Sequence, residues 1–446
     1  MLIAGNWAER KSGETFEVTN PANGDVITEL PDGGREEAAR AIDAAYEAFP
    51  AWAAATAYDR SKILYRAWQL MLERKDHLAR TMTEEQGKPL RAATTEVQYA
   101  ADFLLWFAEE AKRVYGETIP SARPDQRFIV MHQPVGVVAA VTPWNYPVSM
   151  ITRKVGPALA AGCTVVLKPA EATPLCAVET FKILEEAGVP KGVINLVTAK
   201  DPRPVGEEFV SNPKVAKLTF TGSTAVGKML AGKAAANMKR VSCELGGHAP
   251  FMVFEDANPV HAAKGAQLVK FLNTGQACIS PNRMYVAEKL VDDFVGTLQE
   301  RVSKMKAGNG FEEGVTIGPL VNEAAVAKVE TQVEDAKAQG AEVVCGGERL
   351  TTGDLGKGHF FAPTVLNGVT PEMRIYREET FGPVAPIIPF ADEREALALA
   401  NDTHYGLAAY VYTRDIARAM RMFEGCLLYT SPSPRDRTRS RMPSSA

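Results

Sequence analysis

The sequence predicts an α/β protein of two units, the first built around a parallel sheet. From residue 136 onward, short apolar segments rich in β-branched residues alternate with segments of helical periodicity. This alternation is typical of βαβ units, in which helices cover both faces of a parallel sheet. After residue 278 the pattern resumes with a different spacing, which indicates a second α/β unit and a boundary near residue 246.

The individual elements follow from the local pattern. Apolar positions three or four residues apart predict helices at 35–50, 59–86 and 90–114, and a β-branched stretch with Pro and Gly predicts strands within 127–142. In the alternating region, helices are expected at 148–161, 174–187, 203–211 and from about 223, with strands in the apolar runs between them. Beyond residue 278, helices are expected at 289–305 and 321–339, and strands at MYVAE, AEVVCGG and AYVYT.

Composition excludes several classes of protein. Of the 446 residues, 46% are hydrophobic and 23% are charged, a balance typical of a globular protein with a large core rather than a disordered chain or a rod. No apolar run reaches the roughly 18–20 residues of a membrane-spanning helix, and the N-terminus lacks the pattern of a secretory signal. The net charge of -4 argues against nucleic acid as a partner. We therefore expect a cytoplasmic protein.

Cys278 is the cysteine with the most informative surroundings. The six cysteines form no CxxC pair and no cluster with histidine, which predicts reduced thiols and neither a disulfide framework nor a metal site. In FLNTGQACIS, Cys278 follows a Gly-Gln turn between an amphipathic helix and a strand. An exposed thiol on such a loop is a candidate nucleophile if a base takes its proton. The alternative is a small buried hydrophobic residue, as most cysteines are.

Glu244 and Asn145 are candidates for acid–base chemistry and for binding an oxyanion. Glu244 precedes the double glycine of CELGGHAP, which predicts close backbone packing or a positive φ. A carboxylate removed from water there can act as a general base, and pairing with Arg or Lys is the alternative. Asn145 lies in TPWNYP, where two prolines restrict the backbone. Its carboxamide can donate to an oxyanion, whereas a structural turn with an aromatic plug is the alternative.

Two further segments suggest a bound phosphate or nucleotide. KLTFTGSTAVGKM predicts a strand, a glycine turn and a helix, and the helix start at Gly222-Ser223 suits a phosphate or pyrophosphate. Its GxxxxGK spacing resembles a P-loop, but Met229 stands where a hydroxyl should reach magnesium, and an ordinary capped helix is a further alternative. In VVLKPAEATP a strand ends at Lys168, and Glu171 follows. Such a carboxylate can bind ribose hydroxyls, or the two residues can form a surface ion pair.

Taken together, six segments resemble the aldehyde dehydrogenase family. PWNYP, KPAEATP, FTGST, ELGG, GQAC and EETFGPV occur in this order, and the likeness runs from residue 1 to about 425. Two longer segments, YAADFLLWFAEEAKRVYGETIP and PVSMITRKVGPALAAGCTVVLKPAEATP, look most like the succinate-semialdehyde dehydrogenase branch. The resemblance implies a Rossmann-type NAD-binding domain at 1–113 and 135–245, a β-hairpin oligomerisation arm at 114–134, and an α/β catalytic domain at 246–425.

The resemblance also implies a reaction and the residues that perform it. It predicts oxidation of an aldehyde to the acid through a thiohemiacetal and a thioester on Cys278, without a metal. Asn145 and the N–H of Cys278 would form the oxyanion hole, and Glu244 would activate the hydrolytic water. Contacts to the cofactor are implied for Trp144, Lys168, Glu171, Gly222, Ser223, Glu379 and Phe381. The cofactor is expected to be NAD rather than NADP, because Glu171 would repel a 2′-phosphate, and the enzyme is expected to be a homodimer or homotetramer.

Two departures from the family pattern concern the substrate and the C-terminus. The succinate-semialdehyde branch commonly has an Arg six residues before the nucleophile, where this chain has Leu272, whereas the other Arg of that branch, Arg153, is retained. A short ω-carboxy aldehyde such as succinate semialdehyde is therefore expected, with one anchor for its carboxylate. Residues 426–446 are rich in Ser, Pro and Arg where the family would have a Gly-rich loop and a last strand, which predicts a disordered, non-native tail.

Other functions are compatible with the same residues. A broad-specificity aldehyde dehydrogenase of another branch would share the chemistry and differ in the substrate. A cysteine hydrolase or acyltransferase would share the nucleophile and the oxyanion hole but need no nicotinamide. An inactive, truncated chain is the alternative if the C-terminal segment replaces sequence that the enzyme needs.

Overall fold

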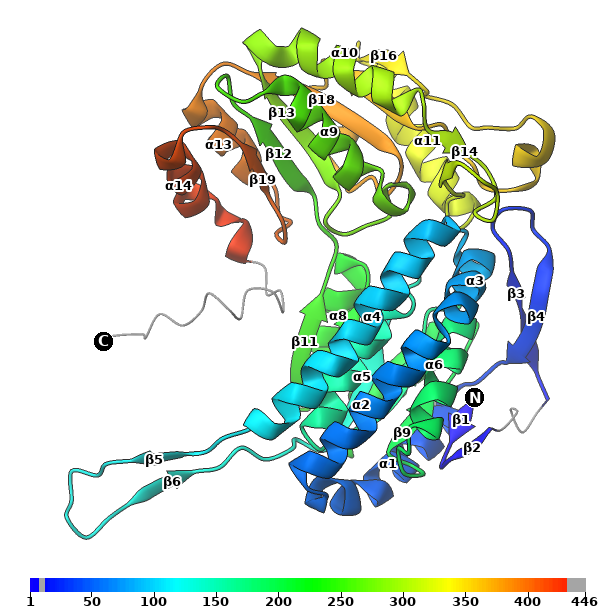
Figure 1. Cartoon of the computed structure of the whole chain (residues 1–446), viewed down its shortest axis with the longest axis vertical. Coiled ribbons are helices and arrows are strands. Elements are labelled where there is room, and N and C mark those ends of the chain that lie inside the picture. The colour runs from blue at the N-terminus through cyan, green and yellow to red at the C-terminus, as the bar shows by residue number, and fades with distance from the viewer. Residues whose placement is uncertain (8–12, 431–446) are drawn as a thin grey trace. The chain divides into compact units, whose positions relative to one another are not determined.

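The structure is a computed structural model that describes residues 1–7 and 13–430 (Figure 1). The chain forms two compact units. The first contains Met1–Thr19, Val26–Glu85 and Arg91–Cys243, and the second contains Asn20–Asp25, Gln86–Leu90 and the chain from Glu244 onward. The predicted α/β class is confirmed, since each unit contains a sheet with parallel strands and helices packed against it.

A sheet in the order β11-β10-β7-β8-β9-β1-β2 forms the centre of the first unit. Its parallel strands are β7 (Val137–Val141), β8 (Thr164–Lys168), β9 (Ile194–Leu196) and β10 (Val215–Thr221). The outer strands are β1 (Leu2–Ile3), β2 (Asn6–Trp7) and β11 (Arg240–Glu244), with β1 antiparallel to both β9 and β2. Every residue of β8 is buried, as expected for a parallel strand that is covered on both faces.

The helices of this unit lie on both faces of the sheet. They are α1 (Arg35–Ala54), α2 (Ala57–Glu73), α3 (Lys75–Gln86), α4 (Leu90–Glu110), the 3-10 helix η1 (Ala111–Arg113), α5 (Ser149–Ala160), α6 (Leu175–Glu186), α7 (Pro202–Ser211) and α8 (Thr224–Ala235). Helix α1 packs against β7, β8, β9 and α7, whereas α2 packs against α5 and α6. Right-handed connections place their helices on one face of the sheet when the chain moves from β7 towards β9, and on the other face when it moves back to β10.

Some predicted elements differ in detail from the structure. The single helix expected at 59–86 is two helices, because Arg74 leaves helical geometry at φ -103° and ψ 19° between α2 and α3. The apolar pattern continues across this break, so periodicity alone does not reveal it. The helix expected at 289–305 begins as the 3-10 helix η3 (Glu288–Leu290) and continues as α10 (Val291–Val302). The antiparallel strands β3 (Thr15–Thr19) and β4 (Val26–Pro31) were not predicted.

The second unit contains a sheet in the order β16-β17-β18-β13-β12-β19. Its strands are β12 (Ala249–Val253), β13 (Pro281–Ala287), β16 (Glu342–Cys345), β17 (Thr364–Asn367), β18 (Val384–Phe390) and β19 (Tyr410–Tyr412), and β14 (Lys306–Ala307) pairs with β15 (Val315–Ile317) outside it. All neighbours in the larger sheet are parallel except β16 and β17. Phe251 and Met284 face a core that includes Phe294 of α10, whereas Tyr285 faces a core that includes Val329.

The remaining helices of the second unit surround this sheet. They are α9 (Pro259–Lys270), the 3-10 helix η2 (Leu272–Gly275), α10, α11 (Glu323–Ala338), the 3-10 helix η4 (Gly353–Lys357), α12 (Arg374–Arg377), α13 (Glu393–Asn401), α14 (Ile416–Gly425) and the 3-10 helix η5 (Leu427–Thr430). Residues 426–430 of the predicted tail are thus described, and residues 431–446 lie outside the described residues.

The segment predicted to form an arm is a β-hairpin. Strands β5 (Glu117–Ile119) and β6 (Phe128–Val130) pair antiparallel, and the hairpin projects from the body of the first unit (Figure 1). Every residue of both strands is exposed, including Ile119, Phe128 and Ile129. Such a row of exposed apolar residues is typical of a surface that another chain covers.

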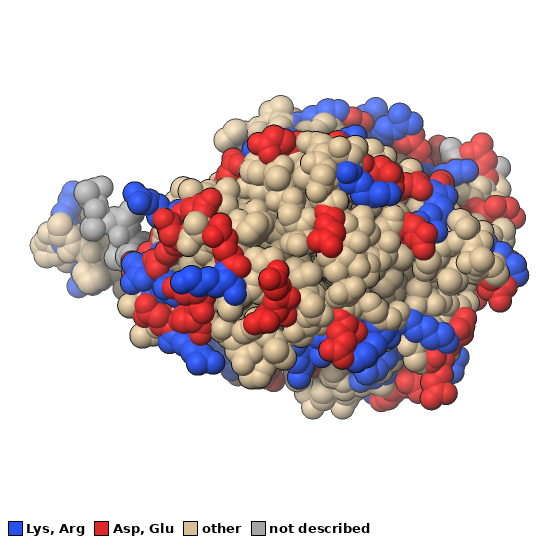
Figure 2. Space-filling view, turned by 90° about the horizontal axis from the view of Figure 1, so that it is seen from above, with Lys and Arg blue, Asp and Glu red and all other residues tan. Residues whose placement is uncertain are grey.

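The surface carries charges of both signs. Figure 2 shows Lys and Arg side chains interspersed with Asp and Glu over the face that it displays. In the second unit, for example, Arg418 pairs with Glu255, Asp256 and Glu393. Within the described residues, no helix is long and apolar enough to cross a membrane, no disulfide is present, and no group of three His, Cys, Asp or Glu could hold a metal ion.

Candidate active site

The predicted residues of the first unit follow the carboxyl ends of its parallel strands. The chain passes from β7 to β8 to β9 on one side and then crosses back, so that β10 lies on the other side of β7. Trp144 and Asn145 follow β7, Lys168 ends β8, and Gly222-Ser223 follow β10. The carboxyl edge at such a reversal of strand order is where open α/β sheets bind ligands.

The loop after β7 is held in place by a residue that sequence analysis missed. Asn145 is buried and Trp144 is half-buried on this loop. Oε1 of Glu96, on α4, accepts hydrogen bonds from the N–H groups of Val148 and Ser149 at 3.1 and 3.2 Å, where α5 begins. A carboxylate at a helix N-terminus is favourable both for its hydrogen bonds and for the helix dipole. Glu96 thereby fixes the end of the loop that carries Asn145.

Lys168 and Glu171 form the ion pair that was considered as an alternative to ribose binding. Nζ of the buried Lys168 lies 2.9 Å from Oε2 of Glu171, whose side chain is about half exposed. The carbonyl oxygen of Lys168 accepts a hydrogen bond from Thr142 at 3.2 Å, which ties the end of β8 to the segment after β7. The lysine orients the carboxylate, and the side chain of Glu171 remains about half exposed. The ion pair is therefore compatible with a ligand that binds the carboxylate oxygen other than Oε2.

Gly222 and Ser223 form a compact helix start. Ser223 is the N-cap of α8, and its Oγ accepts from the N–H of Val226 at 3.4 Å. A Cβ at position 222 would approach the ring of Phe220 to 2.6 Å, so a glycine is needed for the turn. The first N–H groups of a helix have no acceptor within it, and together with the dipole they attract an anion.

Arg153 lies on α5, one turn beyond its start. The guanidinium is half-buried and stacks over the ring of Phe103 at 5.5 Å from its centroid, and Nη1 lies 4.0 Å from Sδ of Met150. These contacts restrict the side chain without neutralising its charge, which leaves the cation able to bind an anionic group. Leu272, the position of the missing second Arg, is exposed in the second unit.

Cys278 lies on a strained and firmly anchored loop of the second unit. Asn273, Thr274 and Gly275 all have positive φ, at 50°, 60° and 76°. A Cβ on Gly275 would lie 2.1 Å from the carbonyl oxygen of Gly382, so the loop packs directly on the segment after Phe381. Consecutive residues in this conformation persist only when their surroundings hold them, and such strain is concentrated at functional sites.

Gln276 and Thr274 hold this loop to residues 318–321. Oε1 of Gln276 accepts from the N–H of Val321 at 3.0 Å, and its Nε2 donates to the carbonyl oxygen of Pro319 at 3.3 Å. Oγ1 of Thr274 accepts from the N–H of Gly318 at 3.0 Å. Both side chains are buried, whereas Cys278 is half-buried. The side chains that anchor the loop are therefore buried, whereas the side chain of Cys278 remains partly accessible to solvent.

The double glycine after Glu244 brings three predicted segments together within the second unit. Glu244 is buried at the end of β11. A Cβ on Gly246 would lie 2.6 Å from Oε2 of Glu379, and a Cβ on Gly247 would lie 2.3 Å from the carbonyl oxygen of Cys278. The N–H of Gly247 donates to Oε1 of Glu379 at 3.0 Å. Glycines are thus required here, because the turn lies in contact with both the nucleophile loop and a carboxylate.

The charge on Glu379 is balanced by groups around it. Burial raises the pKa of Glu379, and the N–H of Gly247 and the ammonium groups of Lys328 and Lys270 oppose this rise. Lys270 is fully buried, with Nζ 2.6 Å from Oδ1 of Asn282, and burial lowers its pKa to about 7. Phe381, two residues beyond Glu379, has a positive φ of 54° and is half-buried.

Comparisons with known proteins agree with this arrangement. The model of the aldehyde dehydrogenase family matches residues 7–426. The chain belongs to this family. Over 95% of its length it is 52% identical to the NADP-dependent succinate-semialdehyde dehydrogenase GabD of Escherichia coli, covering 87% of that protein, and 51% identical to a glutarate-semialdehyde dehydrogenase of Pseudomonas aeruginosa, covering 86%. A crystal structure of Staphylococcus aureus betaine aldehyde dehydrogenase with NAD+ has a TM-score of 0.93 at 37% identity, over 95% of this chain and 85% of that one.

The chain is therefore an aldehyde-oxidising enzyme, and its family uses NAD or NADP. The first unit of this aldehyde dehydrogenase has Asn145 and five of the predicted dinucleotide contacts near one sheet edge, namely Trp144, Lys168, Glu171, Gly222 and Ser223, and the second unit contains Cys278, Glu379, Phe381 and the turn after Glu244. Sequence analysis missed Glu96, Gln276 and the other residues that anchor these segments. A buried Glu or Gln on an otherwise apolar face was the signal that could have found them.

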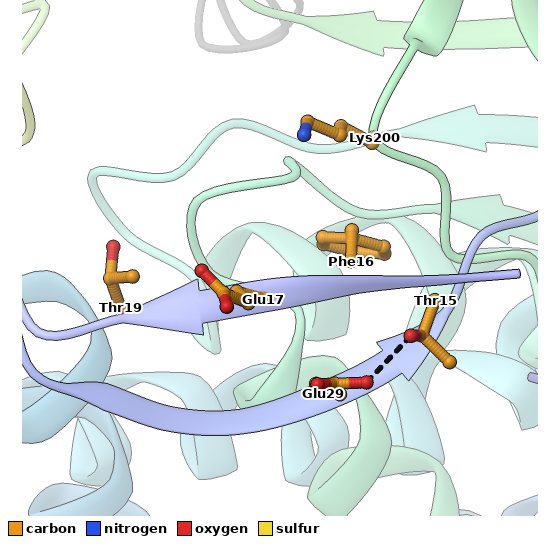
Figure 3. A pocket seen from close by; sticks show the side chains of 6 residues that line it. All are labelled: Thr15, Phe16, Glu17, Thr19, Glu29 and Lys200. Carbon is orange, nitrogen blue, oxygen red and sulfur yellow. Dashed lines mark hydrogen bonds between the residues drawn. The ribbon is translucent and has the colours of Figure 1, made fainter.

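The first unit also has a surface cavity of about 390 Å³. It is lined by Thr15, Phe16, Glu17, Thr19, Glu29 and Lys200 (Figure 3). Oγ1 of Thr15 donates to Oε2 of Glu29 at 2.6 Å across one wall. None of the predicted site residues is among the residues that line this cavity.

Proposed function

We propose that this aldehyde dehydrogenase oxidises a short aldehyde with a distal carboxylate, such as succinate semialdehyde, to the corresponding acid, with NAD as the preferred cofactor. The observation that carries the proposal is the anchored, strained loop of Cys278, packed against the turn after Glu244 and next to the segment of Glu379. The resemblance to succinate- and glutarate-semialdehyde dehydrogenases supports the substrate class.

Each proposed catalytic residue has a distinct task. The thiolate of Cys278 attacks the aldehyde carbon and forms a tetrahedral thiohemiacetal. Asn145 and the N–H of Cys278 stabilise the oxyanion of this intermediate, and donors fixed before the reaction are the most effective for that purpose. A bound nicotinamide dinucleotide supplies the acceptor for the hydride, and a thioester remains on Cys278. Glu244 then removes a proton from the water that hydrolyses the thioester.

The residues at the carboxyl edge of the first sheet fit a dinucleotide. The N-terminus of α8 at Gly222-Ser223 suits the pyrophosphate, and the accessible oxygen of Glu171 suits the hydroxyls of the adenosine ribose. The carboxylate of Glu171 would repel a 2′-phosphate, which favours NAD, although the E. coli relative is named as an NADP enzyme. Lys168 would support the same ribose, and Trp144, Glu379 and Phe381 would hold the nicotinamide end of the cofactor.

Arg153 gives the substrate pocket one cationic anchor. Its guanidinium, held by Phe103 and Met150, can form a charge-assisted contact with a distal carboxylate. Leu272 supplies an apolar surface where the related branch commonly has a second Arg. We therefore expect acidic semialdehydes of four or five carbons to be substrates, with less discrimination against uncharged aldehydes than a site with two arginines would give.

The hairpin β5–β6 serves as an oligomerisation arm in this proposal. Its exposed apolar residues, including Ile119, Phe128 and Ile129, are better explained by a second subunit than by solvent. A homodimer or homotetramer follows, and sedimentation velocity measures which of the two forms.

One experiment tests the proposed function directly. The protein is mixed with NAD or NADP and with succinate semialdehyde, glutarate semialdehyde or butanal, and the absorbance at 340 nm is followed. We expect reduced cofactor to form fastest with NAD and the two acidic aldehydes, and the Cys278→Ala variant to form none. Activity retained in Cys278→Ala would contradict the mechanism, and a preference for butanal would contradict the substrate class.

A further inference from the structure

Two hydrogen bonds join the turn after Glu244 to the segment that carries Glu379. The N–H of Gly247 donates to Oε1 of Glu379 at 3.0 Å. One residue later, Nε2 of His248 lies 2.7 Å from the carbonyl oxygen of Tyr376. A carbonyl oxygen only accepts, so the proton of His248 is on Nε2. Because the two bonds engage different residues on each segment, they fix the register of the segments as well as their separation.

Arg283 holds the backbone of His248. This fully buried residue of β13 donates from Nε to the carbonyl oxygen of His248 at 3.0 Å. Its Nη1 and Nη2 donate to the carbonyl oxygens of Leu399 and Ala400, at 2.9 and 3.0 Å, in the last turn of α13. A cation is favourable at the C-terminal end of a helix. The backbone of His248 is thereby fixed to β13 and α13, and its ring reaches from this fixed point to Tyr376.

The ring of His248 remains neutral. It is 3% exposed, and burial lowers its pKa to about 3, with the nearby charges of Arg283, Lys270 and His404 acting in the same direction. Among the described residues Nδ1 has no hydrogen-bond partner, as expected for the lone pair of a neutral ring whose proton is on Nε2. The hydrogen bond to Tyr376 is therefore present across the whole pH range in which the enzyme would work.

We propose that His248 is a positioning residue for the dinucleotide: by donating to the carbonyl of Tyr376, it keeps the carboxylate of Glu379 in place for the nicotinamide ribose. This inference rests on the proposed function, which assigns that contact to Glu379. Gly247 also lies against the carbonyl oxygen of Cys278, so the same bond sets where the carboxylate lies relative to the nucleophile loop. Without it, the hydrogen bond from Gly247 would remain to hold Glu379 to the turn.

Three variants separate the hydrogen bond from the bulk of the ring. His248→Leu removes the donor at similar volume, and His248→Gln keeps an N–H group of similar reach. His261→Leu is the matched control, because the ring of His261 is exposed at the start of α9 in the same unit. The dissociation constant of NADH is measured from the fluorescence of the bound cofactor, alongside KM for NAD and kcat with succinate semialdehyde. Thermal unfolding shows whether each variant folds.

We expect His248→Leu to raise the dissociation constant of NADH and the KM for NAD about tenfold, the effect of losing one buried hydrogen bond. We expect kcat to change less than about threefold. We expect His248→Gln and His261→Leu to bind NADH within about twofold of the wild type, because His248→Gln keeps a donor for the carbonyl of Tyr376 and His261→Leu leaves His248 unchanged. A role confined to stability would instead lower the unfolding temperature and leave NADH binding unchanged.

The outcomes distinguish this inference from the proposed function. A wild-type protein that oxidises no aldehyde would contradict the proposed function. With an active wild type, a folded His248→Leu that binds NADH normally would overturn the positioning role, and so would a His248→Gln variant as impaired as His248→Leu. If His248→Leu does not fold, His248→Met, which is flexible and also lacks a donor, replaces it with the same expected result.

Discussion

The α-carbon of Gly247 lies against the carbonyl oxygen of Cys278, so closely that a Cβ on the glycine would come within 2.3 Å of that oxygen. Both groups belong to the backbone, and neither can yield as a flexible side chain would. The loop of Cys278 is also anchored through Gln276 and Thr274. Any side chain at position 247 must therefore displace either the turn after Glu244 or the nucleophile.

We predict that Gly247→Ala lowers kcat/KM at least about 100-fold, because a displacement of about 1 Å at a reacting group has effects of this size. Gly296→Ala is the matched control, since Gly296 lies inside α10 with open space around its α-carbon. There alanine should stabilise the helix by about 0.5–1 kcal/mol and leave activity unchanged. Steady-state kinetics and chemical unfolding of both variants check this, and a fully active Gly247→Ala would disprove the close contact.

The role of Glu244 can be separated from that of Cys278 by rapid mixing. If Glu244 activates the hydrolytic water, Glu244→Gln should reduce one NAD per site in a burst and then stall with a thioester on Cys278. Stopped-flow absorbance at 340 nm measures the burst, and mass spectrometry of the denatured protein detects the thioester. Loss of the burst itself would instead make Glu244 the base for the thiol, and unchanged turnover would remove it from the mechanism.

We expect the choice between NAD and NADP to depend on the carboxylate of Glu171. We expect the wild type to prefer NAD in kcat/KM, because a carboxylate and a 2′-phosphate repel each other. Glu171→Gln removes that repulsion and releases Nζ of Lys168, now 2.9 Å from the carboxylate, to meet the phosphate. The ratio of kcat/KM for NADP over NAD should rise about tenfold or more in this variant. A wild type that prefers NADP would refute the assignment of Glu171.

The places of the candidate site residues in the fold could be predicted from the sequence, because these residues lie beside strand ends and glycine turns. Lys168 ends a strand, Ser223 caps a helix, and Cys278 comes shortly after a Gly-Gln turn, so each is visible within about ten residues of sequence. The alternation of strands and helices likewise predicted the central sheet of the first unit. Strands β3 and β4 were missed because they are only five and six residues long, although Phe16 and Val18 of β3 alternate with exposed residues.

The supporting contacts could not be predicted because they join distant parts of the chain. Glu96 binds the N-terminus of α5 from about 50 positions away, and His248 reaches Tyr376 across 128 positions. A local pattern shows at most that such a polar residue is buried. Its partner depends on how the elements pack, which the structure provides. Gln276 is intermediate, since it was noticed as part of the turn before Cys278 but its bonds to Pro319 and Val321 were not predicted.

Arg153 should affect the substrate only through its charge. We predict that Arg153→Ala raises the KM for succinate semialdehyde about tenfold or more, as expected for the loss of a hydrogen bond to a charged group. Butanal, which has the same number of carbons and no carboxylate, should show no such change. Steady-state kinetics with both aldehydes measures the difference. An unchanged KM for succinate semialdehyde would show that another group binds its carboxylate.

Glu85 makes the stability of the first unit depend on pH. Its carboxylate is 1% exposed and accepts from the N–H groups of Leu175 and Cys176, at 2.7 and 2.9 Å, at the start of α6. Burial raises its pKa to about 7, although the hydrogen bonds from Cys176 and Leu175 oppose this. The loop of Lys168 and Glu171 leads directly into this helix start, so the same contact supports the proposed cofactor site.

The direction of the pH effect follows from proton binding. Between pH 4.5, the ordinary value, and about 7, the folded state holds a proton on Glu85 that the unfolded state has released. The free energy of unfolding contributed by Glu85 therefore falls as the pH rises through this window, by up to about 3 kcal/mol in total. Glu85→Gln cannot ionise, so its stability should lack this decline. Glu47→Gln, at an exposed position of α1 in the same unit, is the control and should follow the wild type.

Urea unfolding of the three proteins at pH 5 and pH 8 measures this contribution. The difference in stability between Glu85→Gln and the wild type should shift in favour of the variant by about 2–3 kcal/mol from the lower to the higher pH. Gln has one acceptor oxygen where Glu has two, so one of the two N–H groups at the helix start loses its acceptor and the variant is less stable than the wild type at pH 5. That loss is the same at both pH values and does not alter the shift. Parallel stability curves for Glu85→Gln and the wild type would show that Glu85 is already ionised at pH 5 in the folded protein.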